Sequence, residues 1–297
     1  MASLSKKVLI TGIDGFTGKY LESFFEKKGY EIFGTVLSET DSKNYFTCDI
    51  RKSSDIQDII VNVQPDYILH LAAISFVDES DSSLIYDVNV IGTQNILDAV
   101  IKSKLNPEKI IIASSATVYG NQGKEVLDES MCPMPVNHYG ISKLAMEHVV
   151  RTYFDKLNII MTRPFNYTGT GQAEHFLIPK IVKHYQDKAE IIELGNLHVA
   201  REFNSIDFVA KVYMELMQSN INSETVNLCS SKAIKLLDVI EMMNDISGYE
   251  IEVRVNPAFV RENEIPVLRG SVEKLSELIG KVDSDNFNVT LKQMYDE

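Results

Sequence analysis

Short apolar runs alternate, through the first half of the chain, with segments in which apolar residues recur every three or four positions. The short runs are typical of strands buried on both faces, and the longer spacing is typical of amphipathic helices. The runs predict strands near 7–11, 31–36, 67–71, 109–114 and 158–162. The segments between them predict helices near 16–28, 53–63, 82–103 and 138–156. This alternation predicts an α/β fold with a doubly wound parallel sheet of the Rossmann type.

The second half of the chain has a less regular pattern. Pro164 ends the last predicted strand, and a helix near 176–187 is followed by a mixture of short strands and helices. With 297 residues the chain exceeds the usual single core of about 100–200 residues. We therefore expect a Rossmann domain over residues 1–165 and a smaller mixed α/β lobe over 166–297, with some segments of the second half returning to the first domain.

Composition and charge exclude several classes of protein. The formal net charge is −13, and the basic residues form no cluster, so we expect no nucleic-acid partner. No apolar stretch reaches the roughly 18 residues of a membrane span, and residues 1–7 leave no room for the apolar core of a signal peptide. The 3 cysteines and 6 histidines lack metal-ligand spacing, which predicts reduced thiols, no metal site and a cytoplasmic protein.

A glycine-rich turn, Thr11-Gly12-Ile13-Asp14-Gly15-Phe16-Thr17-Gly18, lies between the first predicted strand and the first predicted helix. Backbone N–H groups of such a turn and the N-terminus of the following helix face an anion, and a dinucleotide pyrophosphate binds at this place in Rossmann folds. By itself the motif is equally compatible with a plain tight turn. It becomes informative together with residues further along the chain.

Tyr139 and Lys143 are one helical turn apart, so their side chains share a face of the predicted helix. A neighbouring ammonium favours phenolate and lowers the tyrosine pKa from about 10 toward neutrality, where proton donation to a carbonyl oxygen is useful. Ser115 adds a hydroxyl at the carboxyl end of the strand predicted near 109–114, the edge at which parallel sheets bind ligands. Together with the glycine turn, these three side chains predict a hydride-transfer site.

Several further motifs follow in an order that is typical of one family. They lie at residues 11–18, 48–50, 70–73, 88–93, 114–120, 139–143 and 163–166. The chain thereby resembles the nucleotide-sugar branch of the extended short-chain dehydrogenase/reductase family. Its segment 163–172 is most similar to that of reductases acting on GDP-4-keto-6-deoxymannose and related 4-keto sugars. The resemblance implies an enzyme that binds a nucleotide-diphosphate sugar and forms a homodimer through the helices predicted near 82–103 and 138–156.

The resemblance also implies a bound nicotinamide dinucleotide. The residues expected to contact it are Gly12, Ile13, Asp14, Gly15, Phe16, Thr17, Gly18, Ser38, Asp49, Ile50, Leu71, Ala72, Ala73, Tyr139, Lys143 and Pro164. The second predicted strand ends without the aspartate typical of NAD binding and without an arginine for the 2′-phosphate of NADP. Ser38 tolerates a phosphate and a net reduction draws on the NADPH pool, so the interpretation favours NADPH, while Glu39 leaves NAD open.

The residues after Ser115 distinguish among the reactions of the family. In its 4,6-dehydratases a glutamate follows the strand-end hydroxyl, whereas Ala116 and Thr117 stand here, and neither is an acid or base near neutral pH. We therefore expect reduction of the C4 keto group of a nucleotide-linked 4-keto-6-deoxyhexose, with Tyr139 as the acid, Ser115 bonded to the same oxygen and Lys143 holding the nicotinamide ribose. The segment from Ser115 onward also resembles UDP-galactose 4-epimerases, so an NAD-dependent 4-epimerase remains the alternative. A 4,6-dehydratase is a less favoured alternative, because it requires a carboxylate from elsewhere in the fold. A dinucleotide-sensing binding protein is the non-enzyme alternative, disfavoured because the catalytic residues are retained.

Substrate contacts follow from the resemblance as well. Ser75 and Thr117 are expected at the sugar, and Asn166, Arg201 and Arg261 are expected at the diphosphate, which guanidinium groups bind through paired hydrogen bonds. Each of the two arginines is also compatible with an ordinary surface salt bridge. His70 and Arg163 are interpreted as structural residues at strand ends. The sequence identifies neither the nucleotide (GDP, UDP, dTDP or CDP) nor the C4 configuration of the product.

Overall fold

The computed structural model describes residues 5–75, 82–260, 266–284 and 286–297, which form two compact units. The first unit consists of Met1–Gly120, Met131–Pro164 and Val212–Val226. The second consists of Asn121–Ser130, Phe165–Lys211 and Asn227–Glu297. A segment from the second half of the chain is therefore part of the first unit. Among the described helices, none has both the length and the apolar character required to cross a membrane.

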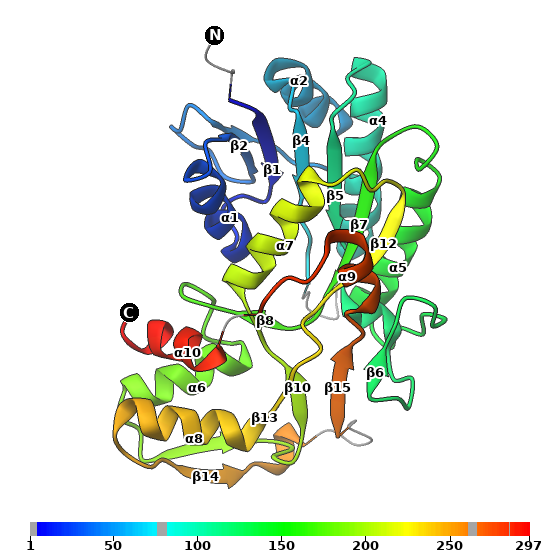
Figure 1. The fold of residues 1–297 in the computed structure, drawn as a ribbon. Coiled ribbons are helices and arrows are strands. Elements are labelled where there is room, and N and C mark those ends of the chain that lie inside the picture. Colours follow the sequence, from blue (N-terminus) through cyan, green and yellow to red (C-terminus); the bar gives the residue numbers. More distant parts are fainter. Residues whose placement is uncertain (1–4, 76–81, 261–265, 285) are drawn as a thin grey trace. The chain divides into compact units, whose positions relative to one another are not determined.

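A seven-stranded sheet, largely parallel, forms the centre of the first unit (Figure 1). Its strands are β1 (Lys7–Thr11), β2 (Glu31–Val36), β3 (Tyr45–Thr47), β4 (Tyr67–His70), β5 (Lys109–Ala113), β7 (Ile159–Pro164) and β12 (Glu224–Leu228). Their order is β12-β7-β5-β4-β1-β2-β3, and each pair from β7 to β3 is parallel. This order confirms the predicted doubly wound Rossmann fold. The strand order reverses between β1 and β4, and ligands of such sheets bind at the carboxyl end of this switch point.

Helices cover both faces of this sheet (Figure 1). Their bounds are α1 (Phe16–Glu26), α2 (Ser53–Val63), α3 (Ser82–Tyr86), α4 (Thr93–Ser103), α5 (His138–Arg151) and α7 (Ile206–Gln218). Buried isoleucine, leucine and valine side chains of α2, α4 and α5 share one core with β4, β5 and β7. Burial of each such side chain contributes about 1.5–3 kcal/mol, so this layer holds α5 firmly against the sheet.

The helix expected over 82–103 is interrupted by a π-helical segment, Asp87–Gly92, between α3 and α4. At this segment the Asn89 carbonyl oxygen accepts a hydrogen bond from the Thr93 hydroxyl at 2.7 Å. Apolar periodicity does not reveal one extra residue in a turn, which is why the sequence predicted a continuous helix. Such π-helical turns are frequent at functional sites.

The second unit is a smaller mixed α/β assembly, as expected. Its strands are β6 (Val126–Leu127), β8 (Tyr167–Thr168), β9 (Ile191–Leu194), β10 (Ala200–Glu202), β11 (Asn204–Ser205), β13 (Ala233–Lys235), β14 (Glu252–Val255) and β15 (Val267–Gly270). Its helices are α6 (Leu177–Gln186), α8 (Leu236–Ser247), α9 (Glu273–Ile279) and α10 (Phe287–Tyr295). A core of apolar side chains joins α6, α8 and α10. The buried Glu202 carboxylate ties β10 to β15, because it accepts the Gly270 amide at 3.0 Å.

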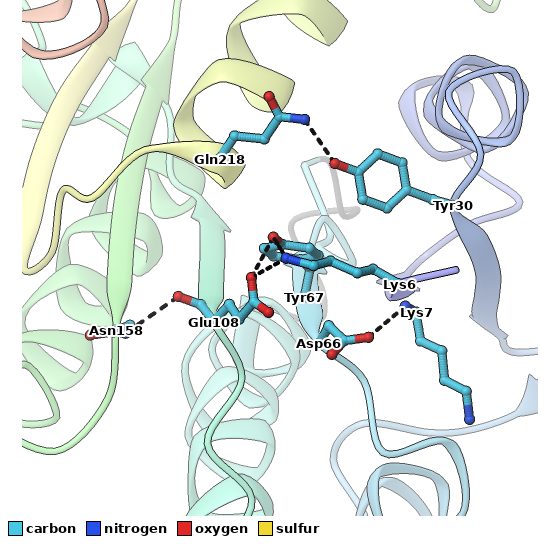
Figure 2. Close-up of polar contacts among 8 residues, drawn as sticks. All are labelled: Lys6, Lys7, Tyr30, Asp66, Tyr67, Glu108, Asn158 and Gln218. Atoms are coloured by element: carbon cyan, nitrogen blue, oxygen red, sulfur yellow. Dashed lines mark hydrogen bonds and ion pairs between the residues drawn. The ribbon is translucent and has the colours of Figure 1, made fainter. Parts of the chain in front are cut away.

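Polar contacts join the first residues of several strands at the amino edge of the main sheet (Figure 2). Lys6 Nζ donates to Tyr67 Oη at 3.0 Å and forms an ion pair with Glu108 at 2.5 Å, and Tyr67 Oη donates to the same carboxylate at 2.6 Å. On the neighbouring side, Gln218 Nε2 donates to Tyr30 Oη at 2.9 Å. The side chains of Lys6 and Glu108 are about half exposed, so this ion pair contributes roughly 0–1 kcal/mol.

A buried ion pair joins α5 to β7. Arg163 Nε and Nη2 donate to the two oxygens of Glu147 at 2.9 and 2.7 Å, and both side chains are almost fully excluded from solvent. The Ser114 hydroxyl, directly after β5, donates to the same carboxylate at 2.7 Å. The guanidinium also lies 4.8 Å from the centre of the Tyr119 ring. One carboxylate thus fixes α5 to two neighbouring strands.

Replacing Glu147 by glutamine is expected to lower the free energy of unfolding by about 3–5 kcal/mol, because the buried Arg163 charge loses its counter-ion. Arg151→Gln is the control, since Arg151 contacts the same carboxylate at 3.8 Å from an exposed position and should cost below about 1 kcal/mol. Urea unfolding followed by circular dichroism measures both variants. Equal losses in the two variants would contradict a dominant role for the buried pair.

Candidate active site

The glycine turn adopts a conformation that a side chain would block. Gly12 has φ +69°, and a Cβ there would lie 3.0 Å from Ala72 Cα; a Cβ on Gly18 would lie 2.6 Å from Gly12 O. The amides of Gly12 and Ile13 donate to Thr35 O at 3.1 and 3.2 Å, which joins the carboxyl ends of β1 and β2. The turn leads into α1, whose N-cap residue, Gly15, has no side chain to cover the first turn. The N-terminus of α1 thus exposes backbone groups at the point where the strand order reverses. Such a place is suited to binding a dinucleotide pyrophosphate.

A chain of buried hydrogen bonds runs from this turn through His70. The Thr93 hydroxyl donates its proton to the Asn89 carbonyl. Because that proton is engaged, Thr93 Oγ1 must accept the hydrogen bond from His70 Nε2, 2.8 Å away. His70 Nδ1 is therefore unprotonated and accepts the Thr11 hydroxyl at 2.7 Å. Thr11 Oγ1 in turn accepts the amides of residues 71 and 72 at 3.2 and 3.3 Å. Burial, together with the Lys143 charge, lowers the pKa of His70 to about 3, so the imidazole is neutral.

The same series of hydrogen bonds continues from Asn89 to α5. Asn89 clamps the backbone of Ile74: its Oδ1 accepts the Ile74 amide at 2.8 Å, and its Nδ2 donates to the Ile74 carbonyl at 2.9 Å. Nδ2 also donates to Ser142 Oγ at 3.0 Å, and the Ser142 hydroxyl donates to the Tyr139 carbonyl at 2.8 Å. These links connect the glycine turn to the first turn of α5. Neither Asn89 nor Ser142 was predicted as a site residue, and the signal for Asn89 was a polar residue within an apolar helical pattern.

Ser115 and Tyr139 are placed by two adjoining turns. Ser115 caps the short 3-10 helix Ala116–Tyr119, and its Oγ accepts the Thr117 amide at 3.2 Å. Asn137 caps α5 by accepting the Gly140 amide at 2.8 Å. A Cβ on Gly140 would lie 2.9 Å from Thr117 O, so glycine at this position allows the two turns to pack directly together. The strand-end hydroxyls and the start of α5 thus form one local assembly.

Lys143 is buried beneath Tyr139, with 3% of the residue exposed. Its Nζ donates to the Ala113 carbonyl at the end of β5, 2.7 Å away, and lies 5.9 Å from the centre of the Tyr139 ring. Burial lowers the pKa of Lys143 to about 8, and the charge of Glu147 one turn later opposes that shift. The ammonium is therefore a cation that titrates close to neutral pH beside the phenol.

The segment after β3 forms the outer part of the predicted cofactor site. Asp49 accepts a bidentate ion pair from Arg51, with Nη2 at 2.7 Å, and this guanidinium holds the pKa of Asp49 below its usual range. Ile50 is buried, and its carbonyl accepts Asn95 Nδ2 at 2.9 Å. At the end of β2, the Ser38 carbonyl accepts the Thr47 hydroxyl at 3.1 Å. The dinucleotide contacts of these residues stay predictions.

The residues expected at the substrate are distributed over the chain. Ser75 is exposed at the end of a described segment of the first unit. Asn166 and Arg201 belong to the second unit, where the Asn166 carbonyl accepts the Asn204 amide at 2.9 Å and Arg201 Nη1 donates to the Ala200 carbonyl at 2.8 Å. Arg261 lies outside the described residues. Their substrate contacts stay predictions.

Comparison with known proteins shows that one protein family matches nearly the whole chain. Residues 9–294 match the family model described as GDP-mannose 4,6 dehydratase. A GDP-6-deoxy-D-talose 4-dehydrogenase from Aggregatibacter actinomycetemcomitans is 36% identical over 275 residues, covering 92% of this chain and 91% of the relative. A GDP-6-deoxy-D-mannose reductase from Pseudomonas aeruginosa is 27% identical, covering 93% and 92%.

Among solved structures, a candidate epimerase from Burkholderia cenocepacia J2315 is 37% identical, with a TM-score of 0.93 and coverage of 98% of this chain and 97% of that one. Fold, site geometry and sequence similarity therefore agree. The chain belongs to the GDP-mannose 4,6-dehydratase family, within the nucleotide-sugar branch of the extended short-chain dehydrogenases/reductases.

Proposed function

We propose that the protein reduces the C4 keto group of GDP-4-keto-6-deoxymannose to give GDP-6-deoxy-D-talose. The observation that supports this proposal is the set of side chains Ser115, Tyr139 and Lys143. Beside them, Thr117 has a hydroxyl at the position where the dehydratases of the family have a glutamate. The name of the 36% identical relative, a 4-dehydrogenase of GDP-6-deoxy-D-talose, supports this nucleotide, this carbon and this product. NADPH is the proposed reductant, with NADH as the alternative.

The residues of the chain have distinct parts in this reaction. The reduced nicotinamide, when bound, supplies the hydride. Gly12, Gly15 and Gly18 allow the turn to pack closely against neighbouring backbone, and the pyrophosphate would bind at this turn and the N-terminus of α1. Tyr139 donates its phenolic proton to the oxygen that develops negative charge, and Ser115 donates a hydrogen bond to the same oxygen. Lys143 holds the nicotinamide ribose and favours the phenolate that remains on Tyr139.

Dehydration requires a base that removes a proton from carbon, and Ala116 and Thr117 supply none. Epimerisation uses the same hydroxyls and ammonium in both directions, with a cofactor that stays on the protein through both steps. Similarity to a 4-dehydrogenase and to a reductase supports net oxidoreduction, whereas similarity to the candidate epimerase of solved structure supports the alternative.

The test is NADPH or NADH oxidation by the purified protein with GDP-4-keto-6-deoxymannose, and with the UDP, dTDP and CDP analogues as a panel. We expect stoichiometric oxidation with the GDP sugar, and nuclear magnetic resonance of the product should give the talo configuration. No oxidation, together with oxidised NAD retained through purification and interconversion of two C4 epimers, would replace the proposal by an epimerase.

Tyr139→Phe is expected to lower kcat by about 10²–10⁴-fold, because the acid that protonates the alkoxide is lost. Its dissociation constant for NADPH, measured by fluorescence titration, should stay within about threefold of wild type, since a single hydroxyl is removed. Tyr153→Phe is the control: this hydroxyl, which donates to Asp98 at 2.7 Å, lies further along the chain after α5. Near-normal turnover of Tyr139→Phe would exclude the acid role.

The pKa of Lys143, lowered to about 8 by burial, predicts the pH dependence of cofactor binding. Below this pH the ammonium is charged and binds the dinucleotide; above it the charge is lost, so the dissociation constant for NADPH should rise about three- to tenfold between pH 7 and 9.5.

Lys143→Met should bind NADPH more weakly at pH 7, and its titration should be flat over the same pH range. Lys109→Met is the matched control, because Lys109 is a second buried lysine whose pKa burial also lowers, but it begins β5 at the opposite edge of the sheet. This control should retain the wild-type pH dependence. An unchanged slope in Lys143→Met would assign the titration to another group.

A further inference from the structure

Two hydrogen bonds from one residue converge on the proposed catalytic serine. Thr117 donates to Ser115 Oγ from its hydroxyl, at 2.9 Å, and from its backbone amide, at 3.2 Å. A serine hydroxyl has two acceptor lone pairs and one proton. Both lone pairs are therefore occupied by Thr117, and the Ser115 proton is left to donate in a third direction.

The donor itself is held in place. The Thr117 carbonyl accepts the Gly120 amide at 3.3 Å, and the missing side chain of Gly140 allows this carbonyl to pack against the first turn of α5. Gly140 directly follows Tyr139. The contact between Thr117 and Gly140 therefore holds both the residue that orients the Ser115 hydroxyl and the residue next to Tyr139.

We propose that Thr117 is a positioning residue, which directs the Ser115 proton toward the C4 oxygen of the substrate. The inference rests on the proposed function of Ser115 and differs from the direct substrate contact that the sequence suggested for Thr117. A Thr117 hydroxyl that donates to Ser115 has no proton left for a substrate oxygen. Donation into Ser115 also polarises the serine hydroxyl and strengthens its own hydrogen bond.

The experiment compares Thr117→Val, Thr117→Ser, Ser115→Ala and the double variant Ser115→Ala/Thr117→Val. The substrate is the nucleotide sugar of the panel that wild type turns over. Valine keeps the shape and the backbone amide of threonine but removes the hydroxyl donor, whereas serine retains it. We expect Thr117→Val to lower kcat about tenfold with KM for the sugar unchanged, and Thr117→Ser to restore kcat to within about threefold of wild type.

The double variant separates positioning from other roles. If Thr117 acts through Ser115, the valine substitution should cause no further loss in the Ser115→Ala background. Equal losses of kcat in both backgrounds would overturn the inference. A raised KM with unchanged kcat in Thr117→Val would also overturn it, in favour of direct substrate binding.

A structural readout separates failure of this inference from failure of the proposed function. If wild type turns over no member of the panel, the proposed function fails, and crystal structures of wild type, Thr117→Ser and Thr117→Val decide the inference. The inference holds if Ser115 keeps a single side-chain rotamer in the first two proteins and adopts another, or several, in Thr117→Val. The same rotamer in all three proteins would refute it.

Discussion

The geometry of the proposed site depends on the buried ion pair between Glu147 and Arg163. Removing two charges from water costs several kcal/mol per ion, and this cost is offset only when hydrogen bonds occupy both partners. Both oxygens of Glu147 accept from Arg163 on β7, and one of them also accepts from Ser114 after β5, which offsets much of this cost. On the other partner, Nη1 of Arg163 has no hydrogen-bond partner among the described residues. Since Tyr139 and Lys143 lie on the same helix as Glu147, a carboxylate that fixes α5 to two strands also fixes the helix that carries the proposed proton donor and the ammonium.

A second constraint links the glycine turn to the first turn of α5. The links through Thr11, His70, Thr93, Asn89 and Ser142 assign a donor or an acceptor role to every side chain involved. Such a chain has one consistent arrangement of protons, and a charged imidazole would break it at Nδ1. Burial keeps the His70 pKa near 3, so this arrangement persists over the pH range in which Lys143 titrates.

Much of this organisation could be predicted from the sequence, because strands buried on both faces and amphipathic helices leave periodic patterns. The glycine turn and the spacing of Tyr139 and Lys143 also carry their chemistry in the residue types. The π-helical segment Asp87–Gly92 could not be predicted, since one extra residue in a turn leaves the apolar pattern nearly unchanged. The role of Glu147 was equally hidden. Arg163 is 16 positions away on the strand that follows α5, and Ser114 comes next to Arg163 only because β5 pairs with β7.

The residue at position 117 affects both the reactions that the proposed site can support and the orientation of Ser115. A hydroxyl, a phenol and an ammonium exchange protons between oxygen atoms, whereas removal of a proton from carbon requires a base such as a carboxylate. A glutamate at 117 would be ionised near neutral pH and could only accept hydrogen bonds, so its side chain could not donate to Ser115 Oγ. Under the proposed function, threonine offers no base for dehydration, and its hydroxyl is the donor that directs the serine proton. In this proposal, a single side chain therefore accounts both for the missing base and for the orientation of the serine hydroxyl.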